Sequence, residues 1–358
     1  MIFSSTWLRS FRVLLFPFSL VYGLMVVVRN YFYDKKLIKS IEFNFPIICV
    51  GNLAVGGTGK SPLVEYLLRI LNYQFKVATL SRGYKRKTRG YILANEHTTA
   101  LDIGDEPMQF HIKFPEVAVA VGEERVFAIP QLLFDREDID LIILDDAFQH
   151  RAVQAGFNIL LTDSNDLFTR DFFLPSGDLR DARSSYKRAD VIIVTKCRQD
   201  FSTAEKKRTI NEIKPLPHQH VFFTGIHYGA PYHITSHAIK HMSCQTEVLL
   251  VCGIANPEPL KKYLQEITKS YESMLFSDHH IFRIDDLHEI KRRFEKFKSP
   301  DRIILTTEKD AVRLIKFSHE LDHIPLYVLP IETTFLFNEA NRFNSLIVTF
   351  IKGFANKN

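Results

Sequence analysis

The sequence predicts an α/β fold: a mostly parallel sheet with helices on both faces, joined to a second, smaller α/β domain. From about residue 45, short apolar runs alternate with stretches of helical periodicity, which is the pattern of strand–helix–strand units. The alternation loosens after residue 215 and resumes near residue 247, which indicates a second domain. At 358 residues the chain is long enough for two domains, each with its own core.

We therefore expect four segments, each marked by a change in the hydrophobic pattern. They are an apolar N-terminal segment (1–40), a main α/β domain (41–224), a smaller α/β domain (225–345) and a C-terminal tail (346–358). The strands of the main domain are expected at 47–51, 76–80, 117–121, 140–144, 157–161 and 190–194. Those of the smaller domain are expected at 247–252, 273–276, 302–306 and 325–329.

The composition is that of an ordinary globular protein, with 46% hydrophobic and 24% charged residues. The net charge of +5 would suit an anionic ligand or a membrane surface if it is clustered. No nucleic-acid-binding motif accompanies this charge, so we expect no nucleic-acid partner, and we favour a monomer. The four cysteines lack metal-site spacing and are expected to be free thiols: Cys49, Cys197, Cys244 and Cys252.

The N-terminal segment is expected to form a helix that lies in a membrane interface. Sixteen uncharged, mostly apolar residues separate Arg12 from Arg29, and Pro17 is expected to interrupt them. A helix of that length rises about 24 Å, less than the ~30 Å hydrocarbon core of a bilayer. Interfacial aromatic residues and a basic collar support this interpretation: Trp7, Tyr22, Tyr31, Tyr33, Lys35, Lys36 and Lys39. A true span, a soluble packing helix and a cleaved signal peptide are the alternatives.

A glycine-rich loop follows the first apolar run and precedes a helical pattern, the order typical of a phosphate-binding loop. Its glycines let backbone N–H groups approach a polyphosphate, and the helix N-terminus adds a positive dipole end. We expect Lys60 to reach the outer phosphates and the Ser61 hydroxyl to hold Mg²⁺. Ala54 replaces the first glycine of the strict motif, and an ordinary surface loop is the alternative. The expected cofactor-binding residues are Ala54, Val55, Gly56, Gly57, Thr58, Gly59, Lys60 and Ser61.

Acidic residues occur at two further places where phosphoryl-transfer chemistry would need them. Asp145 and Asp146 end a strand-like run, and a carboxylate at such a strand end is where nucleotide-binding sheets hold magnesium. Asp105 and Glu106 lie on a predicted loop, where a carboxylate could take the proton of an acceptor hydroxyl. The alternatives are an Asp-rich turn for the first pair and an acidic helix start for the second.

Basic residues are candidates for anion binding. Arg82 and the cluster at residues 85–89 follow the second predicted strand, so an anionic substrate or lipid would be attracted there. Arg125 and Arg180 could clamp phosphate oxygens, although surface salt bridges are the alternative. The strand near residue 194 is not followed by the Asn-Lys-x-Asp of guanine-specific proteins, which favours adenine and hence ATP.

The motifs occur in an order that resembles the tetraacyldisaccharide 4′-kinase family of lipid A biosynthesis, over almost the whole chain. The segments that carry the resemblance are Gly51-Asn52-Leu53, Val55-Gly56-Gly57-Thr58-Gly59-Lys60-Ser61-Pro62, Leu80-Ser81-Arg82-Gly83-Tyr84, Gly104-Asp105-Glu106-Pro107, Asp145-Asp146-Ala147-Phe148-Gln149-His150, Gly177-Asp178-Leu179-Arg180, Asp278-His279 and Thr307-Glu308-Lys309-Asp310-Ala311-Val312.

The resemblance implies a kinase on the cytoplasmic face of a Gram-negative inner membrane. Such a kinase moves the γ-phosphate of ATP to the 4′-hydroxyl of an acylated glucosamine disaccharide 1-phosphate, with Mg²⁺, and has two domains that close over the nucleotide. Under this resemblance, Ser61 and Asp145 would hold the metal. Asp146 and Lys60 would be catalytic residues. Asp105 would take the hydroxyl proton with His279 as its partner. The substrate residues would be Glu106, Arg125, Gln149, His150, Arg180 and Arg82.

Two other classes of function remain open at this point. A nucleotide-switched metallochaperone would share the loop but should offer Cys or His metal ligands. A membrane-anchored ATP-binding scaffold would share the loop and the anchor without any transfer activity. Within the resemblance, Asp181 stands where the family usually has Glu, and His280 beside His279 leaves two candidate imidazoles, of which we choose His279.

Overall fold

A computed structural model describes residue 12 and residues 14–355 of the chain. These residues separate into two compact units. The small unit is His227–Glu332, and the large unit contains the described residues before and after it. Strands β10 (His220–Tyr228) and β16 (Ile331–Phe335) carry the chain from one unit to the other and are neighbours in one sheet.

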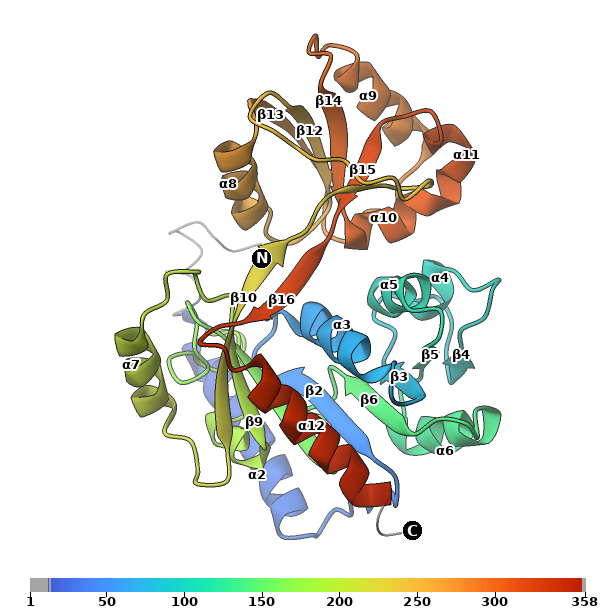
Figure 1. Cartoon of the computed structure of the whole chain (residues 1–358). Coiled ribbons are helices and arrows are strands. Elements are labelled where there is room, and N and C mark those ends of the chain that lie inside the picture. The colour runs from blue at the N-terminus through green and yellow to red at the C-terminus, as the bar shows by residue number, and fades with distance from the viewer. Residues whose placement is uncertain (1–11, 13, 356–358) are drawn as a thin grey trace. The chain divides into compact units, whose positions relative to one another are not determined.

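The large unit is built on a sheet of nine described strands (Figure 1). The strands from β10 to β5 pair in parallel, and β4 joins in the antiparallel direction at the edge. This confirms the predicted mostly parallel sheet. After β16 and β10, the order across the sheet is β9 (Val191–Thr195), β8 (Phe157–Asp163), β2 (Ile47–Asn52), β6 (Leu141–Asp145), β3 (Val77–Ser81), β5 (Ala118–Val121) and β4 (Ile92–Leu93).

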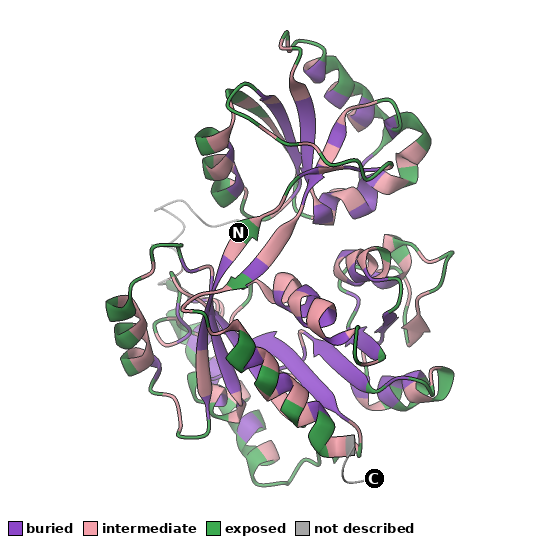
Figure 2. Ribbon diagram, viewed as in Figure 1, coloured by how far each residue is buried: buried purple, intermediate pink, exposed green. Residues whose placement is uncertain are grey.

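The central strands are buried along their length (Figure 2), because helices cover both faces of the sheet. Helices α3 (Lys60–Leu71), α5 (Asp105–Lys113) and α12 (Ala340–Ala355) contribute to the core on one face. Helices α6 (Arg125–Asp135) and α7 (Thr203–Ile213) contribute to the core on the other face. The shorter elements are β1 (Ile41–Glu42), α4 (Ala100–Ile103), β7 (Val153–Gln154) and the 3₁₀ helix η1 (Arg183–Arg188).

Helix α12 corrects the predicted C-terminal division. The predicted boundary puts residues up to 345 in the second domain and the rest in a tail, but residues 333–355 belong to the large unit. The reason is hydrophobic packing: Phe343, Ile347 and Ile351 recur on one helix face and are buried against the main sheet.

Helix α2 (Phe16–Asp34) has an unusual distribution of polar and apolar residues. Its buried positions are Ser19, Gly23 and Asn30, and an added Cβ at Gly23 would lie 2.6 Å from the Phe173 ring. Pro17 lies in the first turn and does not interrupt the helix, since a first-turn proline gives up no helical hydrogen bond. The exposed positions are apolar: Phe16, Phe18, Leu20, Val21, Leu24, Met25, Val27, Val28, Tyr31 and Phe32.

Polar contacts tie α2, and Arg12 before it, to the segment around residues 175–188. Asn30 donates to Asp181 at 2.7 Å, and Arg12 pairs with Asp178 at 2.5 Å. With 19 residues α2 is about 28 Å long. None of the helices in the described residues combines the length and the apolar character that crossing a bilayer would require.

The small unit is a five-stranded sheet whose helices also lie on both faces. Its strand order is β11 (Tyr232–His233), β15 (Leu326–Leu329), β14 (Arg302–Thr307), β12 (Glu247–Cys252) and β13 (Ser270–Leu275). All but β11 pair in parallel. Its helices are α8 (Glu258–Ile267), α9 (Ile284–Phe294), α10 (Glu308–Leu314), the 3₁₀ helix η2 (Ile315–Phe317) and α11 (Ser318–Leu321).

Candidate active site

The glycine-rich loop connects β2 to α3, as the sequence predicts. Gly56 has a φ of 108° and Gly59, the residue before α3, a φ of 83°, so both occupy a region that side chains disfavour. Ala54 instead forms an extended bridge with Leu179, a conformation that needs no glycine. That bridge explains why the first glycine of the strict motif is dispensable in this chain.

The acidic pair lies on the strand next to the loop. Val50 of β2 pairs with Asp145 at the end of β6, so the two strand ends lie side by side. Asp145 is buried, and one of its carboxylate oxygens makes no hydrogen bond with the described residues. Burial, then the neighbouring Asp146, raises the pKa of Asp145 to about 7. A buried carboxylate oxygen without a partner fits a hard divalent cation such as Mg²⁺.

Protein groups alone do not complete a metal site at this place. Among the described residues, no cluster of three or more His, Cys, Asp or Glu side chains is positioned to hold a metal. Mg²⁺ is commonly bound through one or two carboxylates together with phosphate oxygens and water. Asp145 and the Ser61 hydroxyl, which lies in the first turn of α3, are therefore suited to a metal that arrives with a nucleotide.

Asp146 is the centre of a charged cluster. The Lys60 ammonium lies 3.6 Å from its carboxylate, and the Arg180 guanidinium pairs with the same group through both oxygens. Burial alone would raise the pKa of Asp146, but Lys60 and Arg180 outweigh it and lower that pKa. The residue holds a left-handed φ of 50°, a conformation that Asp tolerates better than most residues and that often occurs at functional sites.

Asn52, at the end of β2, joins this cluster although sequence reasoning did not assign it a role. Its side-chain oxygen accepts a hydrogen bond from Lys60 at 3.2 Å and from Arg180 at 2.5 Å. Its backbone oxygen accepts from the Gln149 amide at 2.7 Å. The sequence signal was available, because Asn52 stands directly between the strand and the loop.

A second group of cations surrounds His150. Burial first, and then the charge of Arg125, lowers the pKa of His150, and Arg29 and Arg82 act in the same direction. Arg125 is buried, and burial together with Arg82 lowers its own pKa. We call His150 with these three arginines the arginine ring. It gathers positive charge at one place and is suited to an anionic group.

Helix α2 supplies Arg29 to the arginine ring and touches other candidate residues. The Arg29 guanidinium donates to the backbone oxygen of Gln149 at 3.0 Å, and the Tyr22 hydroxyl donates to that of Arg180 at 3.1 Å. The sequence predicts a membrane-associated helix here and assigns it no residue of the site. Its contacts make it part of the wall of the candidate site.

The other predicted acidic residues lie at the N-terminus of α5. Asp105 is the first residue of the helix and is buried, and the preceding Gly104 has a φ of 92°. Glu106 is close enough to Asp145 for its charge to raise the pKa of that carboxyl. Asp105 is therefore held at the helix end nearest the acidic pair, as a candidate base requires.

His279 lies in the small unit, so its predicted pairing with Asp105 remains a prediction. It follows β13 with a φ of 63°, and its Nδ1 and Nε2 lie 3.3 Å and 3.2 Å from the Arg313 and Lys309 side chains. His280 has a local role, because its ring binds the Asp286 carboxylate at 2.9 Å and stacks on Phe276. Both imidazoles thus contact residues of their own unit, and the choice of His279 remains a prediction.

The raised pKa of Asp145 leads to a stability prediction. Because its folded pKa of about 7 exceeds its unfolded value of about 3.9, the folded chain becomes less stable as the pH rises toward and through 7. The test compares the free energy of unfolding of the parent with that of the neutral variant Asp145→Asn, without metal. Between pH 5 and pH 8 the difference should shift in favour of the variant by on the order of 2–3 kcal/mol. Thermal unfolding at both pH values measures this gain.

The exposed carboxylate of Asp138 provides the matched control. Asp138→Asn should show no such gain. With Mg²⁺ and ATP present, only chains that retain Asp145 should be stabilised further, because ligand binding to the folded state adds stability. A stability difference between parent and Asp145→Asn that does not change with pH would contradict the burial argument.

Comparison with known proteins identifies close relatives over nearly the whole chain. A sequence model of the tetraacyldisaccharide-1-P 4′-kinase family matches residues 11–352. A tetraacyldisaccharide 4′-kinase of Bacteroides thetaiotaomicron is 43% identical over 353 residues, which cover 94% of this chain and 93% of the relative. That of Flavobacterium johnsoniae is 44% identical over 342 residues, covering 95% and 97% respectively.

A solved structure has the same arrangement of elements. LpxK from Aquifex aeolicus, crystallised in complex with ATP, aligns with a TM-score of 0.73 and 26% sequence identity. The alignment covers 95% of this chain and 99% of that protein.

Proposed function

The chain belongs to the tetraacyldisaccharide 4′-kinase family and is a kinase, and from that premise we propose how its site works. Its reaction is transfer of the γ-phosphate of ATP to the 4′-hydroxyl of an acylated glucosamine disaccharide 1-phosphate, a step of lipid A biosynthesis. Neither a non-catalytic scaffold nor a metallochaperone finds support among these relatives.

The observation that carries the proposed mechanism is the cluster of Lys60, Asp146, Arg180 and Asn52 beside buried Asp145. Phosphoryl transfer asks a protein mainly for positioning and for charge neutralisation. Lys60 is proposed to release Asp146 and contact the outer phosphates of ATP. Ser61 and Asp145 would hold Mg²⁺, which would neutralise charge on the transferred phosphoryl group.

Asp105 is proposed to accept the proton of the 4′-hydroxyl. Its place at the first residue of α5 fixes its backbone, and its burial keeps water from competing for the proton. We propose that His279 of the small unit assists it when the two units close over the nucleotide. Such a division of the base would make closure a condition for transfer and would limit wasteful ATP hydrolysis.

The arginine ring is proposed to receive the phosphate on the acceptor sugar. Arg82, Arg125 and Arg29 come from separate parts of the chain, and the charge of each lowers the pKa of His150. Guanidinium groups are well matched to phosphate oxygens. Gln149, Glu106 and Arg180 lie around the same region through their contacts with Asn52, Asp145 and Asp146, and would orient the sugar hydroxyls.

Helix α2 is proposed to seat the enzyme on the cytoplasmic face of the bacterial inner membrane. Its inward side carries small and polar residues and its outward side apolar ones, the reverse of an ordinary surface helix. An outward apolar face is stable in the headgroup region of a bilayer. An acylated acceptor would then reach the site without leaving the membrane.

Substitutions on the outward side test this seat. The triple variant Leu20→Ser, Leu24→Ser, Val28→Ser removes exposed apolar side chains and leaves the inward contacts intact. We expect at least about a tenfold loss of vesicle binding, because burial of apolar area drives interfacial binding. ATP binding should stay within about twofold, since these side chains lie away from the nucleotide loop. Flotation with lipid vesicles and nucleotide titration measure the two effects.

If this triple variant bound vesicles with unaltered affinity, α2 would not be the membrane-binding element. Deletion of residues 1–30 is a poorer test, because it also removes the contacts of Tyr22, Arg29 and Asn30 with the candidate site and its surroundings.

The direct test of the function is a transfer assay. Purified protein is incubated with labelled ATP, Mg²⁺ and tetraacyldisaccharide 1-phosphate in detergent micelles. The expected product is a doubly phosphorylated lipid. Hydrolysis of ATP without labelled lipid, or no consumption of ATP, would count against the proposal.

A further inference from the structure

Helix α6 presents aromatic side chains to solvent where an ordinary surface helix would present polar ones. Phe127 and Phe134, seven residues apart on one side of the helix, are 70% and 79% exposed. The opposite side, with Ala128, Ile129 and Leu132, is buried against the sheet. Exposure of an apolar phenylalanine ring to water is unfavourable. Two such rings on one helix face therefore indicate a surface that binds another molecule or a membrane.

The loop of residues 82–91 lies against the start of α6 and adds positive charge. Glu123 accepts hydrogen bonds from the Arg86 guanidinium at 2.6 Å and from the Gly90 N–H at 3.0 Å. Lys85, Lys87 and Arg89 are exposed, and none of the ion pairs among the described residues uses them.

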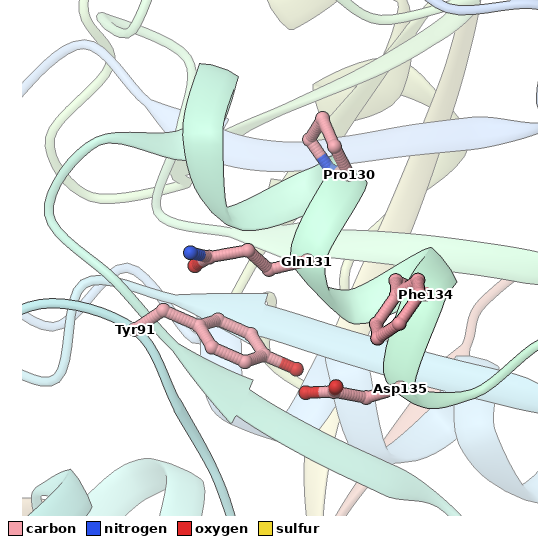
Figure 3. Close-up of a pocket in the computed structure, with 5 residues that line it drawn as sticks. All are labelled: Tyr91, Pro130, Gln131, Phe134 and Asp135. Carbon is pink, nitrogen blue, oxygen red and sulfur yellow. The ribbon is translucent and has the colours of Figure 1, made fainter.

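The same loop carries aromatic residues at both ends. Tyr84 is 61% exposed, and the Lys85 ammonium lies 5.7 Å from the centre of its ring. Tyr91, Gln131 and Phe134 line a surface cavity of about 440 Å³ (Figure 3). We call Tyr84, Lys85, Lys87, Arg89 and Phe127 the loop–helix surface. It combines exposed aromatic rings with unpaired cations, the composition that suits the headgroup layer of an anionic bilayer.

Helices α6 and α2 both pack on the core on one face of the main sheet. Ala128, Ile129 and Leu132 of α6 are buried in the core on one face, and Phe173, against which α2 packs, lies on that same core. The two elements also supply neighbouring members of the arginine ring, Arg125 from α6 and Arg29 from α2. The proposed acceptor site therefore draws residues from two helices, each of which exposes apolar side chains.

We propose that the loop–helix surface is a second membrane contact, which binds the anionic headgroups of the bilayer while Phe127 enters their interface. This rests on the proposed seating by α2 and extends it. Membrane contact through both α2 and the loop–helix surface would hold the site at the bilayer surface. An acylated acceptor could then enter the site from the membrane. Asp135 lies beside Phe134 at the far end of α6, so the contact is expected to be centred on Phe127 and the basic loop.

A fluorescent reporter tests the contact locally. The chain has one tryptophan, so Phe127→Trp in a Trp7→Phe background gives a single signal. We expect its fluorescence to shift to the blue and to be quenched by lipids with brominated acyl chains, in vesicles containing phosphatidylglycerol. Tyr73→Trp in the same background is the matched control, since Tyr73 is 89% exposed but lies outside this surface. Equal quenching of the two reporters, or none at residue 127, would overturn the proposal.

The charge contribution has its own variant. Lys85→Gln, Lys87→Gln, Arg89→Gln should lower binding to anionic vesicles on the order of fivefold per charge removed and abolish the preference over neutral vesicles. An unaltered preference would overturn the electrostatic part of the proposal. Sedimentation without lipid tests other occupants: self-association that Phe127→Ser abolishes would assign this surface to a second copy of the chain instead.

Failure of this proposal is distinguishable from failure of the proposed function. Transfer to the acylated disaccharide in detergent micelles needs no bilayer contact. All of these variants should therefore keep micellar turnover within about threefold of the parent, because none of the substituted side chains belongs to the proposed catalytic cluster.

Discussion

A Lys60→Ala chain is expected to lose on the order of 10³-fold in kcat, because preorganised charge at a phosphoryl-transfer site typically contributes that much. Lys60 is the first residue of the helix that follows the loop, and its ammonium lies 3.6 Å from the Asp146 carboxylate. Its loss would leave Asp146 paired with Arg180 alone. Steady-state transfer to the acylated disaccharide measures the effect.

Lys76→Ala is the control for the loss of one lysine. Lys76 is exposed and precedes β3, at the opposite end of the sheet from the nucleotide loop. Its replacement should leave turnover within about twofold, as for a distant surface site. Full turnover by the Lys60→Ala chain would contradict the proposed mechanism, whatever the effect of the substitution on the affinity for ATP.

An Asp105→Asn chain is expected to keep ATP binding and lose about 10²- to 10⁴-fold in kcat, the usual range for a general base. The change is nearly isosteric, but it removes the negative charge and with it the ability to accept the proton. Because the group that the carboxylate deprotonates is the acceptor hydroxyl, the loss should appear in kcat with little change in the KM for ATP. A pH–rate profile that loses its acidic limb would assign that limb to Asp105.

Asp102→Asn is a close control, three residues earlier in the chain. Asp102 is half-buried and accepts hydrogen bonds from the backbone N–H and the hydroxyl of Thr99 at the start of α4. Its replacement should affect stability by about 1 kcal/mol at most and leave transfer unchanged. If both variants lost activity equally, the loss would reflect distortion of the α4–α5 turn rather than removal of a base.

The main sheet was predictable because its strands are buried on both faces and read as continuous apolar runs. Strands β2, β3, β6, β8 and β9 begin within one residue of the predicted positions. Strand β10 was missed, since histidines at positions 220 and 227 and Gly225 break its apolar run. Helix α12 was missed because its apolar positions recur every three to four residues across the boundary predicted at residue 345.

The candidate site was predictable where its residues follow a strand directly. Asp145 and the glycine-rich loop fall at adjacent strand ends because parallel strands direct their carboxyl ends to one edge. Asn52 and Arg29 were not assigned to it. Their roles depend on side chains from residues 149–180 that only the folded chain brings to them.

The reversed polarity of α2 also affects how its sequence can change over evolution. On most helices the solvent side drifts freely among polar residues, while the inner side is restricted to apolar ones of suitable size. Here Gly23 lies against a phenylalanine ring, Asn30 donates to a carboxylate, and the Ser19 hydroxyl accepts from the Ser176 N–H. The outer positions can exchange one apolar residue for another without loss. Sequence variation along this helix should therefore be greatest at its exposed apolar positions. Charged residues should replace these positions even less often than they replace residues of the protein core.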